Sequence, residues 1–318
     1  MPFRFKLDEP IEKGFRRIGA EQIERARRQV SAGVDAATEI HEARKALKRV
    51  RALLRIGRNG LGEAVFHAEN ARFREIAARM APARDRHVLL QTLATLAATA
   101  PPAAKGAVAR FQKAIAATAG NEPETVDRAR IAGELDRALY RFKRLRLVPD
   151  EFATILSGIT RSYRRARKSF AAAYRSGDDE AFHTWRKGVQ AYWRHMALLS
   201  SAWSDHFEAN VAAARELSQL LGDDHDLALL TMALAELSPG ALSEADTATL
   251  ETLIRQRQQR LRTAASPRGD LLFSEKPETL SRRIGALWQA GTAKRRVDRA
   301  LEDADALEDP AAQRLAGE

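Results

Sequence analysis

The sequence contains no cysteine, and this absence excludes a disulfide framework, a thiolate metal site and a cysteine nucleophile. No apolar run approaches the ~20 residues that a membrane-spanning helix requires. The segment MPFRFKLDEP at the start carries charge from Arg4 onward and lacks the apolar core of a signal peptide. We therefore expect a protein of the cytoplasm.

The sequence also lacks the alternation of apolar and polar residues that is typical of half-buried strands. Glycine (18) and proline (11) are sparse among 318 residues and alanine is abundant, which favours helices. Apolar residues instead recur three and four positions apart. We find no GxxxxGK[ST], no GxGxxG after a strand and no GxSxG, so nucleotide-binding and serine-nucleophile machinery is not indicated. The sequence predicts an all-α protein.

Turn signals divide the chain into expected helices. Pro101-Pro102 cannot continue a helix, Ser176-Gly177-Asp178-Asp179 supplies a C-cap glycine and N-cap aspartates, and Pro239-Gly240 forms a turn. Six helices are expected before Pro149, at 10–31, 36–58, 62–80, 83–99, 103–119 and 123–146. Six more are expected after it, at 150–176, 178–201, 205–220, 223–237, 243–264 and 277–307.

The two sets of helices share sequence landmarks. His41-Glu-Ala-Arg44-Lys45 matches His183-Thr-Trp-Arg186-Lys187, and Arg84-Asp85 and His225-Asp226 each open the fourth expected helix of a set. The His-to-Asp spacing is 44 residues in the first set and 43 in the second. This spacing predicts two tandem helical bundles, 1–148 and 149–300, related by a pseudo-two-fold axis and formed by an internal duplication. Residues 301–318 carry six acids and one base and are expected to be an acidic tail.

Positive charge dominates the chain, whose formal net charge is +11. Between residues 40 and 58 there are seven Lys or Arg and one acid, Glu42. On a helical wheel the cations form one continuous ridge, and an apolar face of Ala43, Ala46, Leu47, Val50, Leu53 and Leu54 lies opposite. Like charges on successive turns repel unless an anion lies across them. We expect the ridge to point away from the core and to bind a polyanion.

The second set of helices repeats part of this ridge. Arg186, Lys187 and Arg194 share a face with His183, but Gln190 and Trp193 replace the cations that correspond to Lys48 and Arg51. The preceding helix adds five cations in eight residues, at positions 161, 164, 165, 167 and 168. Arg offers a planar fork for phosphate oxygens, Lys a mobile charge and His a donor near neutral pH. A polyphosphate chain needs little more than such spaced cations.

These strings resemble the conserved histidine α-helical domain (CHAD) family. The resemblance rests on the HxxRKxxKRxR pattern at 41–51, its partial echo at 183–194, the two helix openings at 84–85 and 225–226, and the Tyr-Arg-Arg-Ala-Arg string at 163–167. Phe273-Ser-Glu-Lys-Pro277, followed by a helix with Trp288, is also similar to the closing helix of that family. The resemblance covers about residues 5–300.

Membership would imply two helical bundles about a pseudo-two-fold axis and a basic surface that binds inorganic polyphosphate. It would also imply association with polyphosphate granules, with granule proteins as further partners, and no catalytic activity. Carried over residue by residue, it assigns binding to His41, Arg44, Lys45, Lys48, Arg51, His183, Arg186 and Lys187. From the charge pattern we add Arg55, Arg84, Arg164, Arg167 and Arg194. We expect no cofactor and no metal.

Other functions remain open from the sequence. The string Gly222-Asp223-Asp224-His225-Asp226 resembles a metal cluster, so an HD-type metal-dependent phosphohydrolase is one alternative. The plainer interpretation is a helix N-terminus capped by Asp223 or Asp224, with Asp226 orienting an arginine of the ridge. Nucleic acid is another candidate ligand, although aromatic residues make up only 6% and provide no evident stacking platform. A membrane-surface helix is a further alternative, but its apolar face would be needed for the core.

Overall fold

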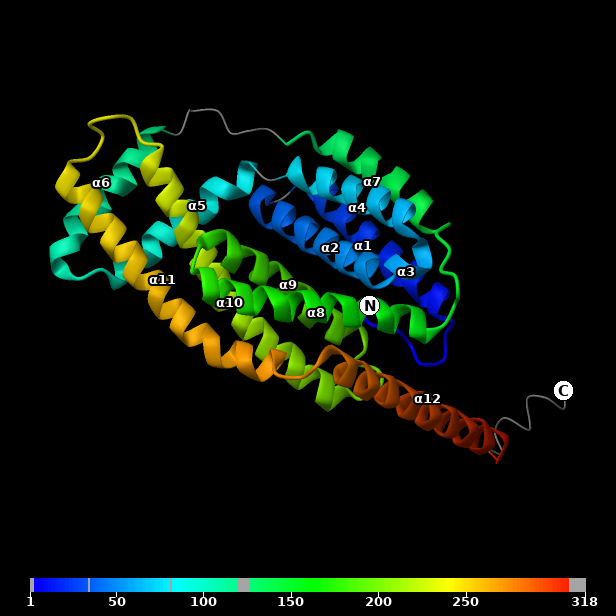
Figure 1. The fold of residues 1–318 in the computed structure, drawn as a ribbon. Helices are drawn as coiled ribbons and strands as arrows, with labels where there is room; N and C mark the ends of the chain where they lie inside the picture. The colour runs from blue at the N-terminus through cyan, green and yellow to red at the C-terminus, as the bar shows by residue number, and fades with distance from the viewer. Residues whose placement is uncertain (1–2, 34, 81, 119–125, 309–318) are drawn as a thin grey trace.

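The computed structural model describes residues 3–33, 35–80, 82–118 and 126–308, and within them every regular element is a helix (Figure 1). None of these helices is both long and apolar enough to cross a bilayer. Those before Pro149 are α1 (Ile11–Ala32), α2 (Ala36–Ile56), α3 (Arg58–Leu61), α4 (Glu63–Ala78), α5 (Pro82–Thr99), α6 (Pro102–Thr118) and α7 (Arg128–Phe142). Those after it are α8 (Phe152–Ser176), α9 (Asp179–Leu198), α10 (Ser204–Ala235), α11 (Glu244–Phe273) and α12 (Pro277–Glu308).

The helix ends mostly agree with the expected ones because their caps are local. Gly177 takes a positive φ of 74° at the end of α8, and the Asp178 side chain accepts a hydrogen bond from the Ala181 amide at the start of α9. The equal division into six and six is wrong, because the short α3 follows α2. Asp127 caps α7 by accepting a hydrogen bond from the Arg130 amide, so this helix begins at Arg128, and the expected start at 123 lies outside the described residues.

Two expected breaks in the second half are absent. We expected one helix to end at 220 and another at 264, but α10 runs through Gly222 and α11 runs through Pro267. A glycine inside a helix costs only about 1 kcal/mol, and packing against neighbours can exceed that. Here α10 packs along both α9 and α11, and its residues Leu221 and Leu227 are buried on either side of Gly222.

The larger hydrophobic core surrounds α2, which Figure 1 places between α1, α4 and α7 on one side and α8 and α9 on the other. The apolar face expected for α2 is confirmed, since all six of its side chains are buried. One side of α9 is buried as well, and with the C-cap residue it contributes Phe182, Trp185, Val189, Tyr192, Met196 and Leu199 to the core. Because these apolar faces form the core, the basic sides of α2 and α9 lie outside it.

A second, smaller core joins the two halves of the chain. Helices α5 and α6 pack against α10 and α11 at the left end of the molecule in Figure 1. Leu93 and Phe111 from the first half meet Leu230 and Leu250 from the second, and all four are fully buried. Each half therefore contributes side chains to this core.

Small residues let the central helices approach closely. A Cβ atom added to Gly158 of α8 would lie 2.1 Å from the carbonyl oxygen of Ile56, at the end of α2. One added to Gly188 of α9 would lie 2.9 Å from the Cα of Ala166 in α8. Only glycine fits these positions, and the close packing brings the basic sides of α2, α8 and α9 together.

Candidate functional site

The basic side of α2 is not the open ridge that the wheel predicts. Arg44, Lys48, Arg51 and Arg55 are all half-buried, because α4, α8 and α9 flank this side of the helix. The expectation that the ridge faces solvent is therefore wrong in this respect. The cations lie within the junction between the two halves, where the lower dielectric strengthens electrostatic interactions.

Arg194 of α9 occupies the centre of this junction, with only 7% of its surface exposed. Its guanidinium donates to the carbonyl oxygen of Gln190 and lies over the ring of Trp193, 4.2 Å from the centroid. Arg215 of α10 lies 4.8 Å from the centroid of the same ring. Burial, together with the charges of Arg49, Arg55, Arg186 and Arg215, lowers the pKa of Arg194 to about 9.

Neighbouring arginines also repel Arg51 and Arg55 on α2. Burial, with the charges of Arg51 and Arg165, lowers the pKa of Arg55 to about 10. Burial and Arg74 lower the pKa of Arg51. We call the set of mutually repelling side chains at the junction the arginine cluster, and it consists of Arg49, Arg51, Arg55, Arg165, Arg186, Arg194 and Arg215.

Neutralising acids are scarce around the arginine cluster. Within the part of the chain that the structure describes, no carboxylate forms an ion pair with Arg49, Arg51, Arg55, Arg165, Arg194 or Arg215. Arg49 donates instead to the side-chain oxygen of Gln22 at 3.3 Å, and Arg51 to that of Asn70 at 3.1 Å. The charge of Glu42 raises the pKa of Arg49, but burial and the charges of Arg25 and Arg215 lower that pKa overall.

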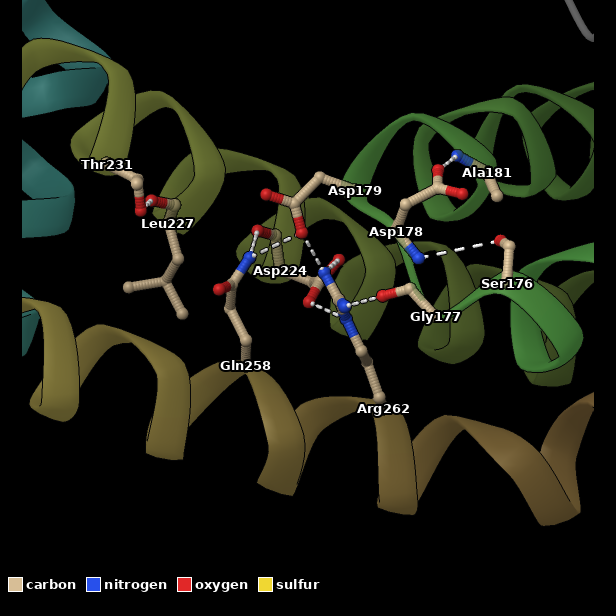
Figure 2. Close-up of polar contacts among 10 residues, drawn as sticks. All are labelled: Ser176, Gly177, Asp178, Asp179, Ala181, Asp224, Leu227, Thr231, Gln258 and Arg262. Carbon is tan, nitrogen blue, oxygen red and sulfur yellow. Dashed lines mark hydrogen bonds and ion pairs between the residues drawn. The ribbon is translucent and has the colours of Figure 1, made fainter. Parts of the chain in front are cut away.

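Arg262 of α11 is a contrasting arginine with a structural role, because carboxylates pair with its charge (Figure 2). Its guanidinium donates to Asp224 of α10 at 2.7 Å, to Asp179 at the start of α9, and to the Gly177 carbonyl at 2.8 Å. Burial alone would lower the pKa of Arg262, but these carboxylates raise it. Arg49, Arg51, Arg55, Arg165, Arg194 and Arg215 form no such ion pair within the described chain, so no carboxylate contact offsets the free energy of holding these charges together.

Other predicted cations lie outside the cluster. Arg164 pairs with Glu278 of α12 at 2.8 Å, and Arg167 donates to the carbonyl oxygen of Phe273 at 2.9 Å, so both point toward the C-terminal helices. Lys45 pairs with Glu42 at 2.6 Å, and Lys187 with Glu180 at 3.8 Å. The structure therefore does not bring these four residues into the cluster.

Two further predicted cations have separate positions. Arg44 donates from Nη1 to the carbonyl oxygen of Ala77 at 2.8 Å. Ala77 lies in the last turn of α4, where a cation interacts favourably with the helix dipole. The side chain of Arg84 lies outside the described residues.

The two histidines of the repeated string have different surroundings. His41 is exposed and lines a cavity of about 780 Å³ between α2, α5, α10 and α11, together with Asp223, Asp226 and Arg257. His183 stacks on His225 of α10, with ring centroids 4.0 Å apart. Burial and the charges of Lys187 and Arg186 lower the pKa of His183. The structure thus places His183 next to the cluster residue Arg186, and His41 at the far end of α2.

The metal-like string at 222–226 is the middle of α10, so Asp223 and Asp224 do not cap a helix as expected. Asp224 is 2% exposed and holds Arg262 (Figure 2), and burial raises its pKa. No three His, Asp or Glu side chains gather as a metal site among the described residues.

Three cluster members were not singled out from the sequence, namely Arg49, Arg165 and Arg215. Arg49 stands within the basic string, whereas Arg215 lies on a helix that carries no basic motif of its own. One signal was available for Arg215, because Trp193 replaces a cation of the motif and an aromatic ring is a common partner of guanidinium groups.

Comparison with known protein families supports the resemblance seen in the sequence. The family model for the CHAD domain matches residues 17–235, from within α1 to the end of α10. The protein belongs to the CHAD domain family. A search of curated proteins found no match. The matched range includes every residue of the arginine cluster, whereas α11 and α12 lie beyond it.

Proposed function

We propose that this CHAD protein binds inorganic polyphosphate without catalysis, and that the arginine cluster is the centre of the binding site. The observation that carries the proposal is the packing of Arg194, which is 7% exposed and shares the ring of Trp193 with Arg215, while neither arginine forms an ion pair with a described carboxylate. A polyanion laid against these groups would replace repulsion with attraction. The family resemblance, with its polyphosphate-binding basic surface, points to the same ligand.

The surroundings of the cluster favour a ligand without bases over nucleic acid. Trp185 and Tyr192 are buried in the core, and the ring of Trp193 is occupied by Arg194 and Arg215. Single-stranded nucleic acid needs an aromatic face on which its bases can stack. A chain of phosphates needs only the charges.

The arrangement of the halves is also a proposal. We propose that residues 1–148 and 149–300 arose by internal duplication and are related by a pseudo-two-fold axis, with the acidic tail at 301–318. The apolar faces of α2 and α9 support this view, since the matching strings at His41 and His183 lie on these two helices. We further propose that the protein acts in the cytoplasm and is recruited to polyphosphate granules.

The test compares two variants of equal charge. The first, Arg55→Gln/Arg165→Gln/Arg194→Gln, removes one cluster arginine from each of three helices. The control, Arg137→Gln/Arg255→Gln/Arg260→Gln, removes three exposed arginines from α7 and α11 that have no ion pair among the described residues. Binding of polyphosphate of defined length is measured by calorimetry at two salt concentrations.

We expect the cluster variant to lose affinity by well over tenfold and to show a shallower salt dependence, because fewer counterions are released. The control should lose severalfold at most, through the shared reduction in net charge. Equal losses in the two variants would show that net charge alone attracts the ligand. Displacement of polyphosphate by an equal concentration of DNA phosphate would favour the nucleic-acid alternative, and stoichiometric divalent metal in the purified protein would favour the phosphohydrolase.

A further inference from the structure

The last helix leaves the body of the protein before it ends. α12 packs against α8, where Trp288 stacks on Phe152 with ring centroids 4.4 Å apart, and Gly291 lies against the backbone of Ala202. Beyond this point α12 continues to Glu308 and projects from the bundle, as Figure 1 shows at the lower right. An isolated helical segment of a few turns is marginal in water, so this projection needs a source of stability.

The projecting segment carries an apolar stripe along one side. Ala293, Val297, Ala300 and Ala304 follow one another at spacings of four, three and four residues, and Leu301 lies beside them. All five are exposed, Val297 by 59% and Leu301 by 60%. This spacing is the heptad pattern of a helix that pairs with another helix.

The stripe faces away from the rest of the molecule. Arg295 approaches Asp8 of the N-terminal turn at 3.8 Å, and this contact marks the side of α12 that faces the body. At 100° per residue, Arg295 lies about 170° from the centre of the stripe. The stripe is therefore open to a partner without any movement of the bundle.

Charge along α12 is divided in a way that selects the partner. Residues 293–299 hold four cations and one acid, whereas residues 300–308 hold four acids and no cation. A second copy in antiparallel orientation brings the basic segment of each chain beside the acidic segment of the other. A parallel copy would place like charges together. We propose that two copies of this protein associate through an antiparallel pair formed by their α12 helices.

Heptad packing fixes the register of this pair. Placing Val297 of one copy level with Ala300 of the other also places Ala293 level with Ala304. Arg296 and Asp303 then flank the stripe on the same side, so Arg296 of each copy meets Asp303 of the other. Both side chains are exposed, and neither forms an ion pair within the described chain. The alanines allow a close approach, but the contact is short, so the dimer belongs to the weak, concentration-dependent class.

The experiment uses the full chain and reverses the two flanking charges separately. Sedimentation velocity over a range of protein concentrations at low salt should show that the wild type dimerises reversibly. The dimer contains two contacts between Arg296 of one copy and Asp303 of the other. Arg296→Glu places two acids together in each of these contacts, and Asp303→Arg places two arginines together. Each variant alone should dimerise at least tenfold more weakly than the wild type. An equimolar mixture of the two variants should regain dimer formation, because only the mixed dimer restores opposite charges in both contacts.

Circular dichroism of each variant checks that the helices remain folded, and the recovery in the mixture is itself proof that both chains are competent. A wild type that stays monomeric at every concentration overturns the proposal. So does a dimer that persists unchanged in both single variants, because its interface would then lie elsewhere. Weakening in each single variant together with recovery in the mixture is the result that the antiparallel arrangement requires. In a parallel pair each single reversal would only exchange one like-charge contact for another, so the single variants would dimerise as the wild type does.

Discussion

Replacing Arg194 by methionine should make the protein more stable and a poorer ligand binder at the same time. The pKa of about 9, against an ordinary 12.5, means that the charged form of Arg194 is about 5 kcal/mol less favourable in the fold than in water. Methionine fills a similar volume without charge and keeps contact with Trp193. It forfeits the hydrogen bond to Gln190 and the cation–π contact, each contributing about 1 kcal/mol.

The balance predicts that Arg194→Met raises the free energy of unfolding by about 1 to 3 kcal/mol. Urea denaturation followed by circular dichroism measures this change at neutral pH and low salt. Affinity for polyphosphate should fall by about tenfold or more, because one central phosphate contact is lost. The control is Arg262→Met, which removes the partner of the buried Asp224 and should instead destabilise the fold by about 3 kcal/mol or more.

A loss of more than about 1 kcal/mol of stability in Arg194→Met would contradict this prediction. Arg194 would then be a structural residue held by interactions that outweigh the repulsion around it. A stabilised variant with unchanged affinity would instead place the binding site away from Arg194.

Further predictions concern acid, packing and ligand. His195 is buried and neutral, donates to the Ala52 carbonyl, and has a pKa lowered by burial and Arg55 to about 3, so stability should be lost as pH falls from 6.5 toward 3. His195→Gln should remove up to about 1.4 kcal/mol per pH unit of that loss in urea titrations. Gly158→Ala should destabilise by about 2 to 4 kcal/mol in urea denaturation, whereas Gly133→Ala in α7 should stabilise slightly. Polyphosphate should raise the melting temperature in thermal scans, and an unchanged value would contradict binding to the folded state.

The sequence predicts most of the helices and the buried face of α2, because both follow from local periodicity. It could not tell which basic side of α8 would meet α2. The charge pattern selects Arg164 and Arg167, but Arg165 is the neighbour of Arg55, because one position along a helix changes the direction of the side chain by 100°. That choice depends on how α8 packs, which a wheel does not contain.

The break expected at Gly222 failed for a related reason. Glycine followed by two aspartates is a common turn signal, so the string at 222–226 predicts a helix start. In the fold, Arg262 from α11 forms an ion pair with Asp224, and α10 continues through this position. The partner lies 38 residues away, and no local pattern reveals it.

The arginine cluster itself is a tertiary feature. Arg55, Arg165, Arg186 and Arg215 come from four helices, and the close α2–α8 and α8–α9 contacts at Gly158 and Gly188 help bring them together. Each basic string taken alone is compatible with a solvated surface. The mutual lowering of pKa values is visible only once the helices are packed.

Chemical footprinting of arginines shows whether polyphosphate lies on the arginine cluster. The folded protein is treated with phenylglyoxal with and without polyphosphate, and modification is located by mass spectrometry. Arg165 and Arg215, the exposed members of the cluster, should be protected by the ligand, whereas Arg255 and Arg260 on α11 should react as before. Protection of Arg255 and Arg260 with continued reaction at Arg165 and Arg215 would place the ligand on α11 and contradict binding at the arginine cluster.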